Sequence, residues 1–157
     1  MRSKCLLVLI LFLLESCSSD SIAFESYKSP ENAAWSLSKP IELSFEQEDL
    51  NRTYEVLMHV RHNQSYSYSN LFLFREIFYE GKRQFGDTME IQLADVYGRW
   101  HGEGIGSIKQ LDFPFKRSLM KLDGQGKYQF IFTHGMRTEI LEGVESIGLT
   151  FKNVDPE

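Results

Sequence analysis

Apolar side chains alternate with polar ones along most of the chain, and this period of two limits the fold more than any other feature does. In a β-strand, successive side chains point to opposite faces, so each alternating run places one row on a core and the other toward water. Five runs follow this rule, with apolar rows at Ile41, Leu43 and Phe45; Tyr54, Val56, Met58 and Val60; Met89, Ile91 and Leu93; Tyr128, Phe130 and Phe132; and Ile147, Leu149 and Phe151. Residues 71–79 begin with four successive apolar positions, which predicts a strand covered on both faces.

Turn-forming residues separate these runs. Glu80-Gly81, Gly86-Asp87 and the stretch 123–126 have the composition of tight turns. No run beyond the N-terminal region shows a helical stripe, and no internal repeat is present. Six or more short strands at this spacing predict an all-β fold, a single antiparallel β-sandwich of the jelly-roll type, over residues 31–157.

The N-terminus has a different composition and predicts an export signal. Two basic residues precede an apolar run from Cys5 to Leu14, and Ser16 and Cys17 follow it. The run is about half of the ~20 residues that a membrane-spanning helix needs, so residues 1–16 are predicted to be a cleaved signal peptide. Leu14, Ser16 and Cys17 fit the cleavage box of bacterial lipoproteins, from which Glu15 departs. An ordinary secretory signal or an uncleaved anchor are the alternatives.

Cysteine usage favours lipidation at Cys17. The chain has two cysteines, and Cys5 leaves with the signal, so the mature protein would hold one thiol and no intramolecular disulfide. Two or more acyl chains on Cys17 would hold the protein stably on a membrane. The serine-rich residues 17–30 are predicted to be a lipid-anchored tether. Ser18 is not the aspartate that retains many lipoproteins at the inner membrane, which favours the outer membrane.

Composition and motif spacing exclude several function classes. The 157 residues suffice for one domain, and a net charge of −5 argues against nucleic acid as a partner. His59 and His62 lie three apart on a predicted strand and therefore point to opposite faces. His101 and Glu103 would share a face but lack a third ligand, and no serine lies in a nucleophile elbow. We therefore expect no metal, no cofactor and no catalytic residue.

A glycine-rich segment at 94–108 interrupts the alternation. A phosphate-binding loop would require a helix after these glycines, and no helical pattern follows. The segment instead predicts a bulged strand and a connection in which glycine permits positive φ and close backbone approach. Because glycine-rich loops on a rigid sheet are common contact sites, it is our candidate interaction surface. Its candidate residues are Asp95, Gly98, Arg99, Trp100, Gly102, Gly104 and Gly106.

The same segment resembles a known family. The pattern Asp-x-x-Gly-Arg-Trp-x-Gly-x-Gly-x-Gly at 95–106, with Ala34-Trp35, Tyr68-Ser69-Asn70-Leu71 and Glu142-Gly143-Val144, is similar to the GldH gliding-motility lipoproteins of the Bacteroidota. The resemblance covers essentially the whole chain. It implies an outer-membrane lipoprotein in a gliding apparatus coupled to type IX secretion. We expect the periplasmic face rather than the cell surface, although the sequence leaves the leaflet open. The resemblance also implies other envelope gliding and secretion proteins as partners, and no catalytic residue.

An exported carbohydrate-binding β-sandwich is the alternative function. Its sugar platforms would be exposed aromatic side chains, and core packing accounts for most aromatics in a chain of this composition. Exposure of both tryptophans would favour sugar binding, whereas burial would argue against it. The candidate platforms are Trp35, Tyr66, Tyr68, Tyr97 and Trp100. Separately, Asp20-Ser21-Ile22 and Asp87-Thr88-Met89 match a short O-glycosylation pattern of exported proteins in this phylum.

Overall fold

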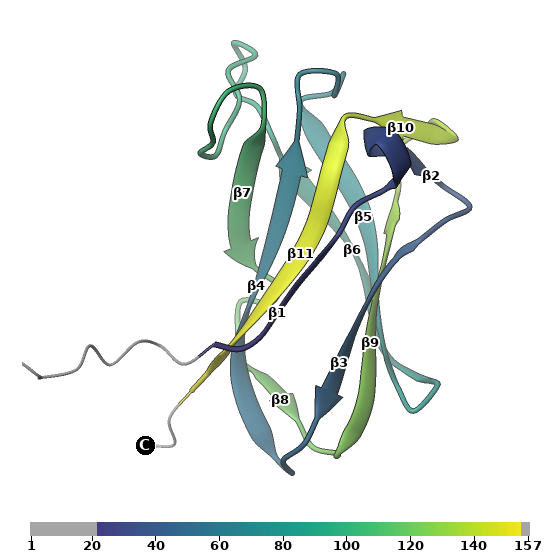
Figure 1. Ribbon diagram of the computed structural model, residues 1–157, viewed down its shortest axis with the longest axis vertical. Helices are drawn as coiled ribbons and strands as arrows, with labels where there is room; N and C mark the ends of the chain where they lie inside the picture. Colours follow the sequence, from purple (N-terminus) through teal and green to yellow (C-terminus); the bar gives the residue numbers. More distant parts are fainter. Residues whose placement is uncertain (1–21, 155–157) are drawn as a thin grey trace, which may run out of the picture.

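The computed structural model describes residues 22–154, which form two packed β-sheets (Figure 1). The predicted signal peptide and Cys17 lie outside the described residues. All strand pairings between named strands are antiparallel, as predicted for a β-sandwich.

The strands divide between two main sheets and one small one. The first sheet has the order β1 (Ile22–Lys28), β11 (Val144–Asn153), β4 (Arg52–His62) and β7 (Lys109–Pro114), and β8 (Met120–Leu122) also pairs with β4. The second sheet has the order β3 (Ile41–Gln47), β9 (Gly126–His134), β5 (Asn70–Tyr79) and β6 (Lys82–Gln92). A third sheet pairs β2 (Ala34–Ser36) with β10 (Ile140–Glu142), after the short 3-10 helix η2 (Glu31–Ala33).

The core lies between the two main sheets and consists of the predicted apolar rows. Phe151 of β11 stacks on Phe45 of β3, with ring centroids 4.7 Å apart, and meets Phe130 of β9 edge-on at 5.3 Å. Each fully buried side chain of this size contributes about 1.5–3 kcal/mol relative to an exposed one. These inward rows therefore hold the two sheets together and confirm the period-two prediction.

The strand β1 shows that the predicted tether is too long. We assigned residues 17–30 to a tether, but Ile22–Lys28 pairs with β11 along the edge of the first sheet. The reason is Phe24, whose ring packs against Phe45 at 5.0 Å and Phe151 at 5.5 Å. A single aromatic side chain reaching the core is enough to bring this serine-containing segment into the sheet.

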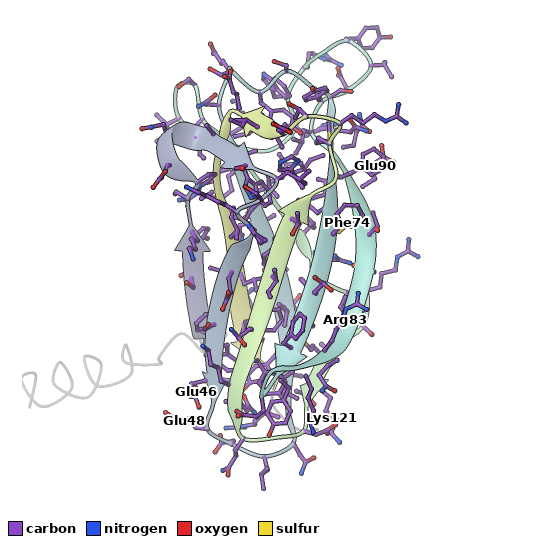
Figure 2. The ribbon with its side chains drawn as sticks, turned by 90° about the vertical axis from the view of Figure 1, so that its right-hand side faces the viewer. Glu46, Glu48, Phe74, Arg83, Glu90 and Lys121 are labelled. Carbon is purple, nitrogen blue, oxygen red and sulfur yellow. The ribbon has the colours of Figure 1, made fainter. Side chains whose placement is uncertain are left out.

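Two further expectations differ from the structure. In β5, Leu71 and Leu73 are buried, but Phe72 and Phe74 lie on the outer face of the second sheet and are exposed. Figure 2 shows Phe74 on this side of the molecule. Gly86-Asp87 is not a turn. It lies inside β6, where Asp87 opposes Arg75 of β5 and forms an ion pair with it at 2.6 Å.

The chain connections gather at the two ends of the sandwich. We call the end formed by residues 29–40, 63–69, 93–108 and 135–143 the distal end, and the end formed by 48–51, 80–81 and 115–125 the proximal end. Ile22 lies opposite Lys152, which lies opposite Glu55 of β4. The described chain therefore begins level with Glu55. Along β4, Glu55 is seven residues, or about 23 Å, away from His62 and the distal end.

Candidate interaction surface

The predicted glycine-rich segment connects β6 to β7 at the distal end and forms two loops. The first is a tight turn around residues 95–98. Asp95 holds it, because its Oδ1 accepts hydrogen bonds from the backbone N–H of Tyr97 at 2.8 Å and of Arg99 at 3.0 Å. Gly98, with φ +77°, donates its N–H to the carbonyl of Asp95 at 3.0 Å. The backbone hydrogen bond from Arg99 is the main reason that the pKa of Asp95 is lowered, so the carboxylate is charged while it holds the turn.

The turn presents apolar side chains to solvent. Val96 and Tyr97 occupy its tip, with 93% and 81% of their surface exposed. The guanidinium of Arg99 lies over the ring of Tyr97, 5.4 Å from its centroid, while its Nε pairs with Asp95 Oδ2 at 2.7 Å. An ordered turn with an apolar tip is suited to contact another molecule, since the backbone is already fixed before contact.

Trp100 attaches this segment to the core. Its half-buried ring packs on His62, with centroids 4.5 Å apart, and lies 6.4 Å from Tyr66. The backbone around Trp100 is also paired with the residues that follow β6. Trp100 forms an antiparallel bridge with Ala94, and His101 donates its N–H to the carbonyl of Leu93 at 2.8 Å. Burial lowers the pKa of His62, so its imidazole is neutral where it supports the tryptophan.

The second loop is a narrow hairpin whose glycines are required by its backbone. Glu103 and Gln110 exchange two backbone hydrogen bonds, of 3.0 and 2.7 Å. A side chain at Gly104 would place its Cβ 2.0 Å from the carbonyl oxygen of Ile108, and one at Gly102 would be 2.2 Å from that of Gln110. Positive φ and close approach thus account for the glycines, as predicted, and β7 rather than a helix follows them.

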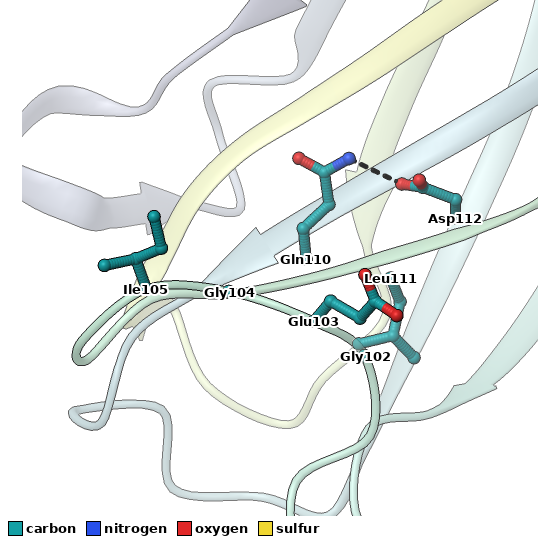
Figure 3. Close-up of a pocket in the computed structure, with 7 residues that line it drawn as sticks. All are labelled: Gly102, Glu103, Gly104, Ile105, Gln110, Leu111 and Asp112. Carbon is teal, nitrogen blue, oxygen red and sulfur yellow. Dashed lines mark hydrogen bonds between the residues drawn. The ribbon is translucent and has the colours of Figure 1, made fainter.

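An open hollow is bordered by residues 102–105 of this hairpin and by residues 110–112 of β7 (Figure 3). Glu103 is on one side of it and Asp112 on the other, while Gln110 Nε2 donates to Asp112 Oδ1 at 2.7 Å. Ile105 lies at the hairpin tip and is 97% exposed. Among residues 22–154, no group of three side chains has a metal-binding arrangement.

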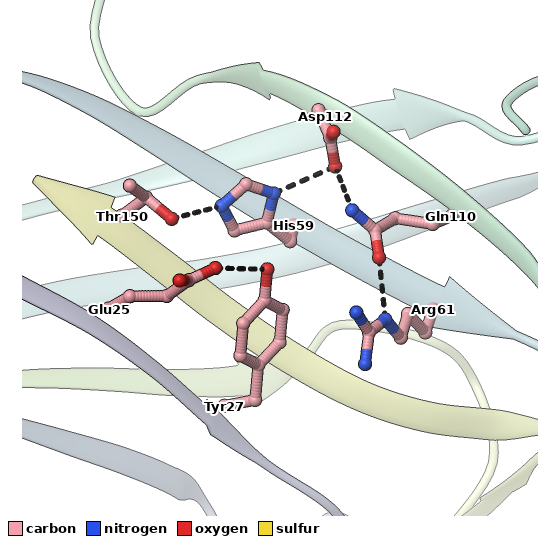
Figure 4. A network of polar contacts seen from close by, with 7 residues as sticks. All are labelled: Glu25, Tyr27, His59, Arg61, Gln110, Asp112 and Thr150. Carbon is pink, nitrogen blue, oxygen red and sulfur yellow. Dashed lines mark hydrogen bonds and ion pairs between the residues drawn. The ribbon is translucent and has the colours of Figure 1, made fainter. Parts of the chain in front are cut away.

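A polar network on the outer face of the first sheet was not predicted (Figure 4). His59 Nδ1 lies 2.7 Å from Asp112 Oδ1, and His59 Nε2 lies 2.8 Å from Thr150 Oγ1. Burial alone would raise the pKa of Asp112, but the hydrogen bonds from His59 and Gln110 outweigh it and the pKa is lowered.

The carboxylate–imidazole–hydroxyl order resembles a nucleophilic triad, but its surroundings give it a structural role. His59 is only 5% exposed and Thr150 only 4%, so a substrate could not reach the hydroxyl. The ring of Tyr27 lies 5.3 Å from that of His59 and lies across Gly148, where a Cβ would be 2.3 Å from the tyrosine. The network joins β1, β11, β4 and β7. His59 faces outward and His62 inward, as their spacing predicted.

The candidate sugar platforms are not available as a pair. Trp35 is buried, with 1% of its surface exposed, and donates its Nε1–H to the carbonyl of Lys39 at 3.1 Å. Trp100 packs against His62, and Tyr66 is also buried. Among the candidate platforms, only Tyr68 and Tyr97 are exposed.

The structure assigns different roles to the predicted surface residues. Asp95, Arg99 and Trp100 build the loops, and the four glycines permit their backbone. The most exposed apolar side chains of the segment lie between them, at Val96, Tyr97 and Ile105, and sequence reasoning did not select the two aliphatic ones. The signal that could have identified them is an aliphatic residue that is flanked by turn-forming residues. Such a residue does not belong to an alternating run and therefore has no predicted place in the core.

Residues 22–151 match the profile of the family described as GldH lipoprotein. The chain belongs to the GldH lipoprotein family. It is 26% identical over 155 residues to a protein of Christiangramia forsetii named gliding motility lipoprotein GldH homolog, covering 94% of this chain and 93% of that one. It is 27% identical over 161 residues to the gliding motility lipoprotein GldH of Flavobacterium johnsoniae, covering 98% of both.

Membership of the GldH family identifies a gliding-motility lipoprotein and confirms the resemblance drawn from the sequence. Among solved structures, dimeric latent PorU from Porphyromonas gingivalis is similar over 88% of this chain and 14% of that one. Its TM-score of 0.37 and identity of 10% are too low to support an argument. No helix within residues 22–154 has the length and apolar character to cross a membrane.

Proposed function

We propose that the protein is a non-enzymatic outer-membrane lipoprotein of the gliding machinery that acts through protein–protein contacts at its distal end. The observation that carries this proposal is the distribution of exposed apolar side chains. Of the twelve large apolar side chains exposed within residues 22–154, seven lie at the distal end. They are Leu37, Tyr68, Val96, Tyr97, Ile105, Ile108 and Ile140.

The described chain begins at a different level of the molecule from this surface. An acylated Cys17 would precede Ile22 by five residues, which span at most about 17 Å when extended. The body of the sandwich would then separate the distal end from the membrane that holds the lipid. Such an arrangement presents Val96, Tyr97 and Ile105 to proteins beyond the headgroups.

The site chemistry supports binding rather than catalysis. The acid–imidazole–hydroxyl set of Asp112, His59 and Thr150 is closed to substrate. Ser18 does not match the inner-membrane retention signal, which favours the outer membrane. We propose the periplasmic face and an association with type IX secretion because the relatives are named gliding motility lipoproteins and the chain resembles the GldH family. Carbohydrate binding loses its principal platforms, since Trp35 is buried and Trp100 is half-buried.

Colony spreading of gliding cells tests the proposal. Replacing Val96 and Ile105 by aspartate should abolish spreading while leaving the amount of folded protein unchanged, because both side chains are exposed. The matched control replaces Leu50 and Leu119, two exposed leucines at the proximal end, by aspartate, and cells that carry it should spread normally. Equal spreading of both double variants would contradict the proposed surface.

A separate variant tests the anchor. Cys17→Ala should remove labelled fatty acid from the protein and release it from the outer-membrane fraction. Retention of label in this variant would refute lipidation at Cys17.

A further inference from the structure

The strand β6 is a free edge of the second sheet. It spans Lys82–Gln92 and pairs only with β5 among the strands of residues 22–154. Exposed edges of this length are ready to pair with another extended chain, and natural proteins usually shorten, bend or cover them. Figure 2 shows Arg83 and Glu90 of β6 and Phe74 of the neighbouring β5 along this side of the molecule.

The register shows which backbone groups of β6 point outward. Leu93 donates its N–H to the carbonyl of Ser69 at 2.7 Å, so hydrogen-bonded pairs of the β5–β6 ladder fall on odd-numbered residues of β6. The N–H and C=O groups of Gly86, Thr88 and Glu90 therefore face away from β5. They form a row of unpaired donors and acceptors at the spacing that an added strand requires.

Hollows lie on both faces of this edge. On the outer face, a hollow of about 420 Å³ is lined by Phe74, Thr88 and Thr133 and by the ion pair of Arg83 with Glu76. On the inner face, at the mouth between the sheets, a hollow of about 540 Å³ is lined by Phe115, Met89 and also Thr88. An added strand would direct alternate side chains into these two hollows, which is how strand addition achieves specificity.

The charge around the inner hollow favours an acidic occupant. Lys116 and Arg117 line it, and no carboxylate of residues 22–154 lies within ion-pair distance of either. Lys116 Nζ lies 3.9 Å from the ring centroid of Phe85, so a cation stands beside an apolar wall. Asp87 does not oppose an acidic partner, since Arg75 binds both of its carboxylate oxygens, at 2.9 and 2.6 Å.

We propose that β6 binds an extended segment of a partner protein, with alternating apolar and acidic side chains, as an added edge strand. A second copy of this chain is disfavoured as the occupant. Antiparallel pairing of two β6 strands about their centres would bring two sets of the cations Lys116 and Arg117 to one seam, where they would repel each other. This site is independent of the distal loops and of the proposed function.

Selection of peptides against the full chain tests the site. The probe is a display library of random ten-residue peptides, presented to the full-length protein in detergent. Enriched peptides should alternate apolar and acidic residues and should bind competitively with one another. Absence of enrichment, or enrichment of basic peptides, would overturn the proposal.

Two variants at one position isolate the backbone contribution. Thr88→Pro removes an N–H that points away from β5, and edge strands tolerate proline at such positions. Thr88→Val keeps the N–H. The proline variant should weaken binding of an enriched peptide at least tenfold, and the valine variant should change it less than threefold. Equal binding by both would overturn strand addition.

Charge variants keep the test decisive if the proline variant fails to fold. Lys116→Glu with Arg117→Glu should weaken binding of the same peptide at least tenfold, and Lys127→Glu on β9 should leave it unchanged. Unchanged binding by the double variant would contradict the acidic occupant.

Hydrogen exchange distinguishes a partner segment from a second copy. Peptide binding should slow exchange at the amides of Thr88 and Glu90, with little change at Asp87 and Met89, which already pair with β5. Exchange at Thr88 that slows with protein concentration alone, without peptide, would show self-pairing and overturn the proposal.

Discussion

Removal of the Trp100 ring should separate the structural role of the glycine-rich segment from its contact role. The ring covers His62 at 4.5 Å and approaches Tyr66 at 6.4 Å, and it is half-buried. Replacing a fully buried tryptophan by alanine costs about 3–5 kcal/mol. With roughly half of that burial, Trp100→Ala should lower the free energy of unfolding by about 2 kcal/mol.

Urea unfolding of a soluble form without residues 1–17, followed by circular dichroism, measures this cost. With a slope of about 2 kcal/mol per molar urea, the midpoint should fall by about 1 M. The matched control is Tyr97→Ala, because Tyr97 is 81% exposed and its loss should change stability by less than about 0.5 kcal/mol. A Trp100→Ala midpoint within 0.2 M of the wild type, or an equal loss in Tyr97→Ala, would refute the assignment of Trp100 as the attachment point.

Two further predictions concern pH and the hairpin. Burial lowers the pKa of His62 and of His134, so below about pH 6.5 the unfolded chain binds protons that the folded chain does not. The free energy of unfolding should therefore be constant from pH 8 to 7 and fall as the pH drops to 5. His62→Gln should make this fall with pH less steep. An equally steep fall in the variant would count against a neutral His62. Gly106→Ala should destabilise the domain by about 1–2 kcal/mol, the cost of positive φ alone. Gly104→Ala should destabilise it at least twice as much, because the new Cβ would lie 2.0 Å from the carbonyl oxygen of Ile108. Equal losses in urea unfolding would contradict the close approach.

Alternation predicted the inward rows because burial on one face leaves a direct record in the sequence. Tyr54, Val56, Met58 and Val60 face the core in β4 as expected. The same reasoning failed at Phe72 and Phe74, since an apolar outer face looks like a strand covered on both sides. It failed at β1 because that strand has only Phe24 to place in the core, and at Gly86-Asp87 because Arg75, which pairs with Asp87, comes from the neighbouring strand.

The sequence predicted the irregular backbone of the glycine-rich segment but not which of its side chains reach solvent. The glycines at 98–106 indicate unusual backbone, which a single sequence can show. That Trp100 packs on His62, from a strand more than thirty residues earlier, depends on tertiary structure. Val96 and Ile105 are exposed because each lies at the tip of a loop, and the loop geometry depends on backbone contacts that a single sequence does not show.

Photo-crosslinking in gliding cells tests the central claim most directly. A crosslinking amino acid at Val96, Tyr97 or Ile105 samples the distal end, and the same residue at Leu50 or Leu119 samples the proximal end. The account predicts one discrete protein adduct shared by the three distal positions and absent from the two proximal ones. Adducts that form equally at both ends, or only at Leu50 and Leu119, would contradict a distal contact surface.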